Sequence, residues 1–302
     1  MTPRTSVIIP VYNTQAYLHE ALESVAAQTR PVKEVIIIDD GSQVPVTLTR
    51  SYKNLEIRIY RTINRGLPSA RNLAADLCRG EFLALLDSDD VWHSEKVAIQ
   101  EDALDNYPHA PLCFTQITYI PPQRRDYQYP VGTREDFLRQ MWKRNYIFPS
   151  TVMIRRQAWF RVRGEESRLW GADDWELWWR LAALGPFVYI PQRLTYYRRH
   201  PDQMTQKTFK MCLDISRAKP LVAKRARLLL ERVGLSAHSI ASSMREFESG
   251  FYDYITYHES TSRALPHLLK AVIRHPLEFH IWRLFLRCLI PDRLIRLIKS
   301  AA

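Results

Sequence analysis

Short hydrophobic runs alternate with segments of helical spacing along the first hundred residues. The apolar runs, rich in β-branched residues, predict strands at 6–11, 34–38, 55–60 and 81–86. Apolar residues that share one helical face predict helices at 16–28, 67–77 and 94–107. Ser94 is the expected N-cap of the third helix. Strands that alternate with helices in this way indicate a parallel α/β sheet.

The pattern is less regular after these elements. Strands are predicted at 112–120 and 151–154, a helix at 173–184, and a short hairpin from 188–190 and 194–197. After about residue 204 the chain changes to amphipathic helices without strands. We therefore place a domain boundary there, between residues 1–203 and a helical region of residues 204–302.

Two of the predicted strands end in clusters of carboxylates. Asp39 and Asp40 follow the second strand, and Asp87 and Asp89 follow the fourth as an Asp-Ser-Asp sequence. In open α/β sheets, ligands bind in the crevice at the carboxyl ends of the strands. We therefore expect these side chains to border a ligand site, with Asp87 and Asp89 on the same side if the strand continues through them.

Each cluster also has an ordinary interpretation. The Asp-Ser-Asp sequence offers the hard oxygen ligands that suit Mg²⁺ or Mn²⁺ bridging phosphates, or it is a solvated acidic turn. A carboxylate at Asp39 or Asp40 accepts hydrogen bonds from a nucleobase or a ribose, or it belongs to an Asp-Gly turn.

Charged residues stand near the start of two of the predicted helices. Arg71, near the start of helix 67–77, is placed to contact a phosphate. Taken by itself, an arginine at such a position is more often an ordinary surface residue. Asp173 and Asp174 begin a tryptophan-rich helix, where one of them could act as a general base beside an aromatic wall. The alternative is a helix N-terminus followed by core tryptophans.

These features occur together and in a particular order, and here the chain resembles the family 2 glycosyltransferases, inverting enzymes of the GT-A fold. The resemblance covers roughly residues 4–203 and rests on SVIIPVYN, EVIIIDDGS, NRGLPSARN, GEFLALLDSDD, STVMIRR, GADDWELWWRL and YYRRH. It implies a Rossmann-like mixed sheet flanked by helices, here followed by an α-helical C-terminal extension. It also implies a nucleoside-diphosphate sugar donor, for which a UDP-sugar is expected.

The resemblance implies a role for each matching residue. Contacts with the donor nucleotide are expected at Pro10, Tyr12, Asp39, Asp40, Arg71 and Asp87. The cofactor, Mn²⁺ or Mg²⁺, is expected at Asp89 and at His200, which is otherwise an ordinary loop histidine. Asp174 stands at the position of the catalytic base, and Asp173 replaces the more common Glu before it. The chain lacks the QxxRW sequence of processive synthases, so transfer of a single sugar is favoured.

The implied reaction moves a sugar to a hydroxyl of a saccharide or lipid-linked acceptor, in polysaccharide or glycolipid biosynthesis. Asp174 would deprotonate the acceptor hydroxyl, which would attack the anomeric carbon in line. Because there is one displacement, the anomeric configuration would invert.

The charge of the chain is concentrated at its end. The net charge is +11, of which residues 204–302 carry +9 (17 Lys and Arg against 8 Asp and Glu). Between residues 268 and 299, basic residues alternate with Trp, Phe, Leu and Ile, and Pro291 divides the segment into two predicted helices. Such helices lie on anionic membranes, or they pack on the catalytic domain.

No signal peptide or spanning helix is predicted, and the four scattered cysteines indicate reduced thiols. A cytoplasmic location, peripheral on the inner face of the membrane, is therefore expected.

Two other classes of function remain open at this point. A metal-dependent nucleotidyltransferase would be expected to carry a phosphate loop rich in Gly and Lys or Arg, and SVIIPVYN contains none. A basic membrane- or nucleic-acid-binding module would not require acidic clusters, which repel phosphates. No nucleic-acid partner is expected.

Overall fold

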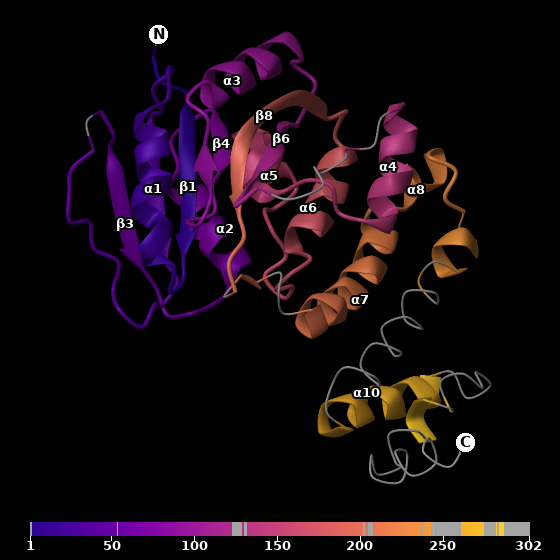
Figure 1. Ribbon diagram of the computed structural model, residues 1–302. Coiled ribbons are helices and arrows are strands. Elements are labelled where there is room, and N and C mark those ends of the chain that lie inside the picture. Colours follow the sequence, from indigo (N-terminus) through magenta and orange to yellow (C-terminus); the bar gives the residue numbers. More distant parts are fainter. Residues whose placement is uncertain are drawn as a thin grey trace.

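One mixed sheet of eight strands organises the part of the chain that the computed structural model describes (Figure 1). That part comprises residues 2–52, 54–122, 129, 132–201, 203–204, 208–236, 238–242, 244, 261–274, 282 and 284–286. The strands are β1 (Thr5–Val11), β2 (Glu34–Asp39), β3 (Ile57–Arg61), β4 (Phe82–Leu85), β5 (Val91–Trp92), β6 (Leu112–Ile120), β7 (Val152–Arg155) and β8 (Val188–Arg198). Their spatial order is β3-β2-β1-β4-β7-β6-β8-β5.

The first half of the sheet is parallel and the second half is mixed. β1 pairs in parallel with β2 and β4, and β2 with β3. β7 runs antiparallel to both β4 and β6, whereas β8 is parallel to β6 and antiparallel to β5. The carboxyl ends of the four parallel strands therefore share one edge of the sheet.

Helices cover both faces of this sheet. They are α1 (Gln15–Ala26), α2 (Leu67–Leu77), α3 (Lys96–Asn106), α4 (Arg134–Lys143), α5 (Arg156–Arg161), α6 (Asp173–Ala182), α7 (Thr208–Arg225), α8 (Arg227–Arg232) and α10 (Thr261–Arg274), with a short 3₁₀ helix η1 (Pro149–Thr151). None of the helices in the described ranges has the length and apolar character that crossing a membrane requires.

Successive residues of the parallel strands serve two separate cores. In β2, Val35 and Ile37 pack in the core beneath α1 and α3, whereas Ile36 and Ile38 pack in the core beneath α2 and α6. All four are fully buried. Because a strand with both faces covered needs apolar residues at every position, its sequence reads as a continuous hydrophobic run, as predicted here.

Most predicted elements are present, and two details were wrong. Segments 188–190 and 194–197 are not a hairpin but parts of the continuous strand β8, because both pair with β6 and a shift in register accommodates the residues between them. The N-cap of α3 is Glu95 rather than Ser94, and it makes no side-chain capping bond.

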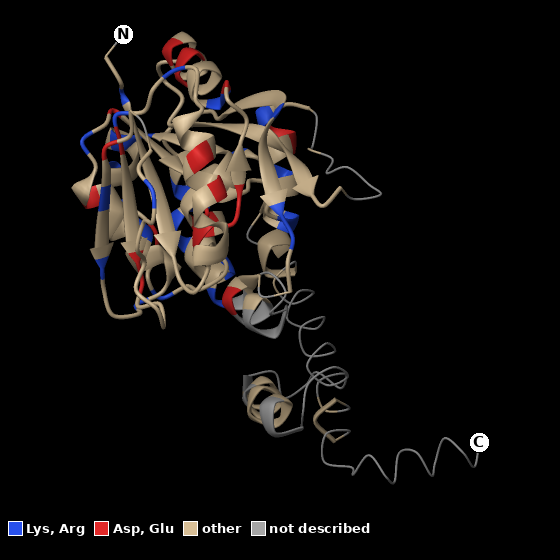
Figure 2. Ribbon diagram, turned by 60° about the vertical axis from the view of Figure 1, so that its left-hand side comes forward, with Lys and Arg blue, Asp and Glu red and all other residues tan. Residues whose placement is uncertain are grey.

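The helical C-terminal region begins as part of the α/β core. Ala218 and Val222 of α7 and Leu230 of α8 belong to the same buried cluster as Trp178 of α6. By contrast, α10 lies away from the sheet in both views of the ribbon (Figures 1 and 2). In the α/β body, acidic and basic residues are interspersed (Figure 2). The boundary near residue 204 stays a prediction, and most of the predicted tail helices lie outside the described residues.

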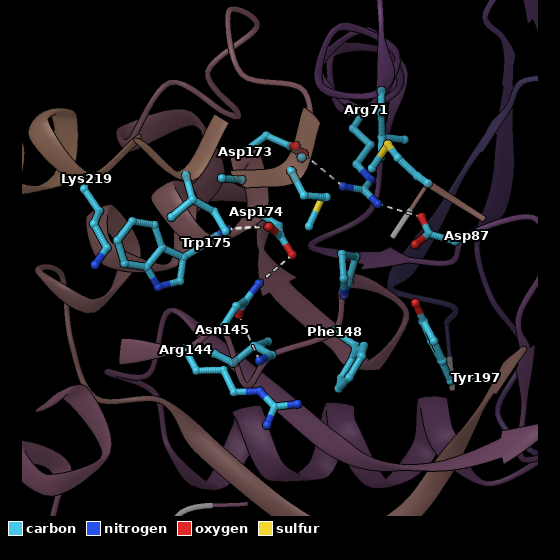
Figure 3. Close-up of a pocket in the computed structure, with 18 of the residues that line it drawn as sticks. Arg71, Asp87, Arg144, Asn145, Phe148, Asp173, Asp174, Trp175, Tyr197 and Lys219 are labelled. Atoms are coloured by element: carbon cyan, nitrogen blue, oxygen red, sulfur yellow. Dashed lines mark hydrogen bonds and ion pairs between the residues drawn. The ribbon is translucent and has the colours of Figure 1, made fainter. Parts of the chain in front are cut away.

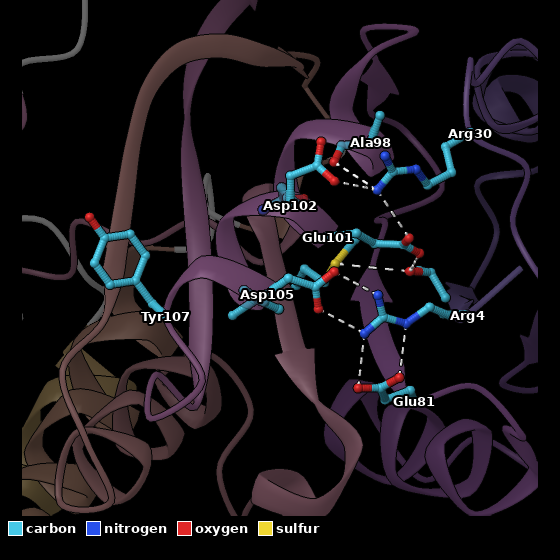
Figure 4. Close-up of polar contacts among 12 residues, drawn as sticks. Arg4, Arg30, Glu81, Ala98, Glu101, Asp102, Asp105 and Tyr107 are labelled. Atoms are coloured by element: carbon cyan, nitrogen blue, oxygen red, sulfur yellow. Dashed lines mark hydrogen bonds and ion pairs between the residues drawn. The ribbon is translucent and has the colours of Figure 1, made fainter. Parts of the chain in front are cut away.

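A network of ion pairs ties together the amino-terminal edge of the sheet (Figure 4). Arg4, just before β1, donates to Glu81 at 2.9 and 3.1 Å and to Asp105 of α3 at 2.7 and 2.8 Å. Arg30, in the loop before β2, donates to Asp102 of α3 at 2.8 Å. These contacts fix α3 against the strand starts, at the edge opposite to the one where ligands bind in such sheets.

A buried carboxylate on β2 anchors the neighbouring segments. Glu34 has no exposed side-chain surface; it accepts hydrogen bonds from Ser6 Oγ at 2.6 Å and from the Arg79 backbone and Nε at 2.6 and 2.9 Å, and it pairs with Arg58. Burial acts to raise the pKa of Glu34, but these hydrogen bonds outweigh it and hold the pKa below its ordinary value.

We expect Glu34→Gln to lower the free energy of unfolding by about 2 kcal/mol near neutral pH, because the hydrogen bonds that Ser6, Arg58 and Arg79 donate to a buried charged group are weakened or lost. A carboxylate with a lowered pKa in the folded state stabilises above its unfolded pKa, about 4.3, and loses that effect as the pH falls through the folded value. The difference between wild type and variant should therefore shrink in acid. Urea unfolding near neutral pH and at a pH of about 3 tests this; a difference that does not change with pH would contradict it.

Candidate active site

The loops at the carboxyl ends of β1 and β2 are held to one another. The backbone N–H of Asn13 donates to Ser42 Oγ at 3.1 Å, and Asn13 Oδ1 accepts from the N–H of Gln43 at 2.8 Å. Pro10 is buried within β1, whereas Tyr12, just after that strand, is 51% exposed. The predicted nucleotide contacts from β1 and β2 are therefore at one edge of the sheet.

Asp39 and Asp40 organise the loops that follow β2. Asp39 accepts from the N–H groups of Ser42 at 2.8 Å and Val46 at 3.1 Å, and from Arg61 at 3.0 Å. Burial acts to raise the pKa of Asp39, yet the hydrogen bonds from Ser42 and Val46 and the charge of Arg61 hold it below its ordinary value. Both carboxylates are buried.

Asp40 sets the start of α2. Its carboxylate accepts from the N–H groups of Arg65 and Gly66, each at 2.8 Å. Gly66 has φ of +90°, a left-handed conformation that glycine adopts without strain, and α2 begins at the next residue. Asp40 therefore helps to position Arg71, one turn further along this helix.

Arg71 lies at the centre of a buried group of carboxylates. Its guanidinium, with the side chain 1% exposed, lies 2.6 Å from Asp87, 3.1 Å from Glu165 and 3.5 Å from Asp173. Burial raises the pKa of Glu165 to about 7 although Arg71 opposes the shift, and burial together with the charge of Glu165 raises the pKa of Asp173. One cation thus holds three carboxyl groups together.

Asp174 has different hydrogen-bond partners from Asp173, the residue before it. Its carboxylate accepts from the N–H of Trp175 at 2.6 Å and from the side-chain amide of Asn145 at 2.8 Å, and it is more exposed than Asp173. Burial raises the pKa of Asp174 to about 6, although Arg71 and these two hydrogen bonds act in the opposite direction. A carboxylate with such a pKa can accept a proton near neutral pH.

Asp174, Arg71 and Asp87 line one cavity of about 380 Å³ (Figure 3). Its walls come from α2, the Asp87 turn, the segment between α4 and η1, the start of α6, and α7. Four of the lining residues are aromatic: Trp142, Phe148, Trp175 and Tyr197. A second set of lining residues is cationic: Lys143, Arg144 and Lys219.

Asp87 and Asp89 have different partners, and the strand does not continue through them, which was the condition for expecting them on the same side. β4 ends at Leu85, and a turn closed by a 3.0 Å hydrogen bond from the N–H of Asp90 to the carbonyl of Asp87 follows it. Asp87 turns to Arg71, whereas Asp89 lies 2.9 Å from Nε2 of His200. The strand therefore ends before period-two alternation could align them.

Asp89 and His200, the two residues predicted to bind the metal, lie side by side. Burial raises the pKa of Asp89, with Asp87 adding to the shift and His200 opposing it, and Nδ1 of His200 is buried without a hydrogen-bond partner. Within the described ranges, no three His, Cys, Asp or Glu side chains are grouped closely enough to hold a metal. A carboxylate and an imidazole nevertheless suit Mn²⁺, and Mg²⁺ commonly binds through one or two carboxylates plus substrate phosphates.

The sequence prediction located part of this site and missed part of it. Of the nine predicted residues, Arg71, Asp87 and Asp174 line the cavity; Pro10, Tyr12, Asp39, Asp40, Asp89 and His200 lie outside its lining. Asn145, Glu165 and Lys219 were missed. Glu165 and Asn145 stand in no recognisable pattern, but Met211, Ile215 and Lys219 recur every fourth residue, which is the signal of one helix face.

Known proteins resemble this chain in sequence and in fold. Residues 6–161 match the family Glycosyl transferase family 2. Chondroitin synthase of Escherichia coli is 30% identical over 203 residues, which are 65% of this chain and 29% of the synthase. The chain thus spans under a third of that relative's length.

Two solved structures share the fold. S. aureus TarS 1-349 in complex with UDP-GlcNAc superposes with a TM-score of 0.60 at 15% identity, over 93% of this chain and 90% of the TarS 1-349 chain. The mannosyltransferase PcManGT from Pyrobaculum calidifontis, in complex with GDP-Man and Mn²⁺, gives 0.55 at 16% identity, over 95% and 86%. These likenesses confirm the predicted α/β fold of GT-A type. With more than half of its residues matching the family, the chain belongs to glycosyltransferase family 2.

Proposed function

We propose that this protein is an inverting glycosyltransferase that moves one sugar from a nucleoside-diphosphate sugar to a hydroxyl of a saccharide or lipid-linked acceptor, in polysaccharide or glycolipid biosynthesis. The observation that carries the proposal is Asp174, a carboxylate with a pKa of about 6 at the wall of the cavity that also contains Arg71 and Asp87. Membership of glycosyltransferase family 2 supports the proposal. That membership favours neither of the two alternatives, a nucleotidyltransferase or a binding module.

Asp174 acts as the general base. The acceptor hydroxyl gives its proton to the Asp174 carboxylate, and the oxygen forms a bond to the anomeric carbon while the bond from that carbon to the diphosphate breaks. The N–H groups of Trp175 and Asn145 orient the carboxylate. Since attack and departure occur on opposite faces in one step, the configuration inverts.

Arg71 and its carboxylate partners lie next to the proposed base, Asp174. Arg71 holds Asp87, Glu165 and Asp173 in ion pairs. Asp173 and Asp174 both line the cavity, but Asp174 accepts hydrogen bonds from Trp175 and Asn145 in place of an ion pair with Arg71. The donor nucleotide is expected at the carboxyl ends of β1 and β2, beside Pro10, Tyr12, Asp39 and Asp40, and a UDP-sugar is the proposed donor. The complex of TarS with UDP-GlcNAc, a protein of the same fold, supports this choice.

Asp89 and His200 would hold Mn²⁺ or Mg²⁺. Such an ion, when bound, supplies positive charge that stabilises the diphosphate leaving group. The Mn²⁺ in the PcManGT complex supports the assignment.

Asp174→Asn should bind donor normally but lower kcat by about 10²-fold or more, because general-base catalysis is removed. In the wild type, kcat should rise with pH through about 6, since the base works only when it is ionised. The test is the release of UDP during transfer, measured against pH. Asp173→Asn is the matched control; if it loses the activity that Asp174→Asn keeps, the base is Asp173.

Asp89→Asn should abolish the enhancement of UDP binding by Mn²⁺ while leaving the thermal unfolding midpoint nearly unchanged, because the residue lies in a turn outside both apolar cores. Calorimetric titration of UDP, with and without Mn²⁺, measures the effect. Wild-type enhancement in Asp89→Asn would show that the ion is held elsewhere.

The basic tail leads to a separate proposal, that the full-length chain binds anionic membranes. Each Lys or Arg near an anionic surface contributes about 1 kcal/mol, so binding should be sensitive to salt. The charge-reversed variant Arg283→Glu with Arg287→Glu, at residues outside the described ranges, should sediment less with anionic liposomes than wild type. Lys224→Glu with Arg232→Glu, at exposed positions of α7 and α8, is the matched control. Equal loss in both variants would mean that net charge alone governs binding.

A further inference from the structure

The turn after β4 is joined to the end of β8 by two reciprocal hydrogen bonds. Asp90, which is 1% exposed, accepts through Oδ1 from the backbone N–H of Arg198 at 2.9 Å. In return, Nε of Arg198 donates to the backbone carbonyl of Asp89 at 2.9 Å. Asp90 immediately precedes β5, and Arg198 is the last residue of β8, the strand with which β5 pairs. This Asp90–Arg198 clamp therefore extends the contact of the two strands beyond their backbone ladder.

Helix α1 holds the side chain of Arg198 in place. Its guanidinium donates to Glu20 at 2.6 Å, and the guanidinium carbon lies 5.0 Å from the ring centroid of Tyr17. The ring of His200 lies 5.0 Å from the same Tyr17 ring, centroid to centroid. Because a long arginine side chain loses rotamer freedom when it is fixed, several contacts along its length are needed to hold one orientation. Arg198 and His200 thus pack on one aromatic ring of α1.

The clamp connects the two segments that carry the residues predicted to bind the metal. Asp89 directly precedes Asp90, and His200 follows Arg198 by two residues. Nε2 of His200 lies 2.9 Å from the Asp89 carboxylate. Each bond of the clamp joins a side chain of one segment to the backbone of the other. The clamp therefore fixes the spacing of the Asp89 carboxylate and the His200 imidazole without using either group as a partner.

Resting on the proposed function, we propose that Asp90 and Arg198 are positioning residues, which hold Asp89 and His200 at the spacing that one divalent cation requires. A cation binds two donors well only when both face the same point, and Mg²⁺ in particular demands near-ideal geometry. Groups that orient metal-binding side chains without touching the ion typically change metal affinity by about 10- to 100-fold when they are removed. Loss of either half of the clamp should therefore weaken the response of the protein to Mn²⁺.

The first test compares Asp90→Ala with Asp90→Asn in calorimetric titrations of UDP, with and without Mn²⁺. Asp90→Ala removes the acceptor of the Arg198 N–H and should reduce the enhancement of UDP binding by Mn²⁺ by about tenfold. Asp90→Asn keeps an oxygen that can accept from the same N–H, so it should retain most of the enhancement. Equal loss in both variants would show that Asp90 acts through its charge, which overturns the proposal.

The second test compares Arg198→Met with Arg199→Met. Both variants lose one positive charge at neighbouring positions, but Arg199 is exposed and is not part of the clamp. Arg198→Met should lose about tenfold of the Mn²⁺ enhancement, and Arg199→Met should keep it. Equal losses would assign the effect to local positive charge and overturn the proposal. If the thermal unfolding midpoint shows that one clamp variant does not fold, the test on the other half of the clamp decides.

UDP binding without Mn²⁺ separates this role from a general loss of structure. It should be unchanged in Asp90→Ala and Arg198→Met, and an equal loss with and without the ion would show that the clamp only maintains the fold. A wild type whose UDP binding does not respond to Mn²⁺ overturns the metal assignment of the proposed function, and this role with it. A wild type that responds, with both clamp variants responding equally, overturns the positioning role alone.

Discussion

The guanidinium of Arg71 is the charge around which the carboxylates of the site are arranged. It lies within ion-pair distance of Asp87, Glu165 and Asp173, which come from three separate segments of the chain. Buried like charges at this spacing would otherwise protonate or separate. Burial raises the pKa of Glu165 to about 7 and that of Asp174 to about 6, and the charge of Arg71 opposes both shifts without cancelling them. The raised pKa of the proposed base thus follows from burial that one cation only partly offsets.

The two aspartates at the end of β2, Asp39 and Asp40, hold the neighbouring loops in place by accepting hydrogen bonds from their backbone N–H groups. Asp39 binds the turn that follows it and Arg61, while Asp40 binds the N–H groups of Arg65 and Gly66 just before α2. Their oxygens therefore shape the loops at the strand ends. Through Gly66, Asp40 also helps to set where α2 begins, and thus where Arg71 is placed.

The sequence predicted the parallel half of the sheet well because its strands are buried on both faces and leave unbroken apolar runs. Helix 67–77 was predicted with the bounds that the structure has. β8 was predicted as a hairpin because Pro191 and Gln192 interrupt its pattern, and only the pairing with β6 shows that the strand continues. Asp87 was found because it follows a predicted strand, and Asp174 because it stands at the start of a tryptophan-rich helix. Glu165 and Asn145 were not, since only tertiary packing brings them to Arg71 and Asp174.

The wall that α7 contributes lies beyond the residues matched by the family, which end at 161. Strands β1 to β4 and α2 are all within the matched part. Asp174, on α6, also lies beyond them. The matched part therefore supplies Arg71 and Asp87 to the cavity, and the later part supplies Asp174 and the face of α7. Because Ala218 and Val222 of α7 pack in the same buried cluster as Trp178 of α6, a chimaera that takes α7 from a relative needs the matching α6 as well.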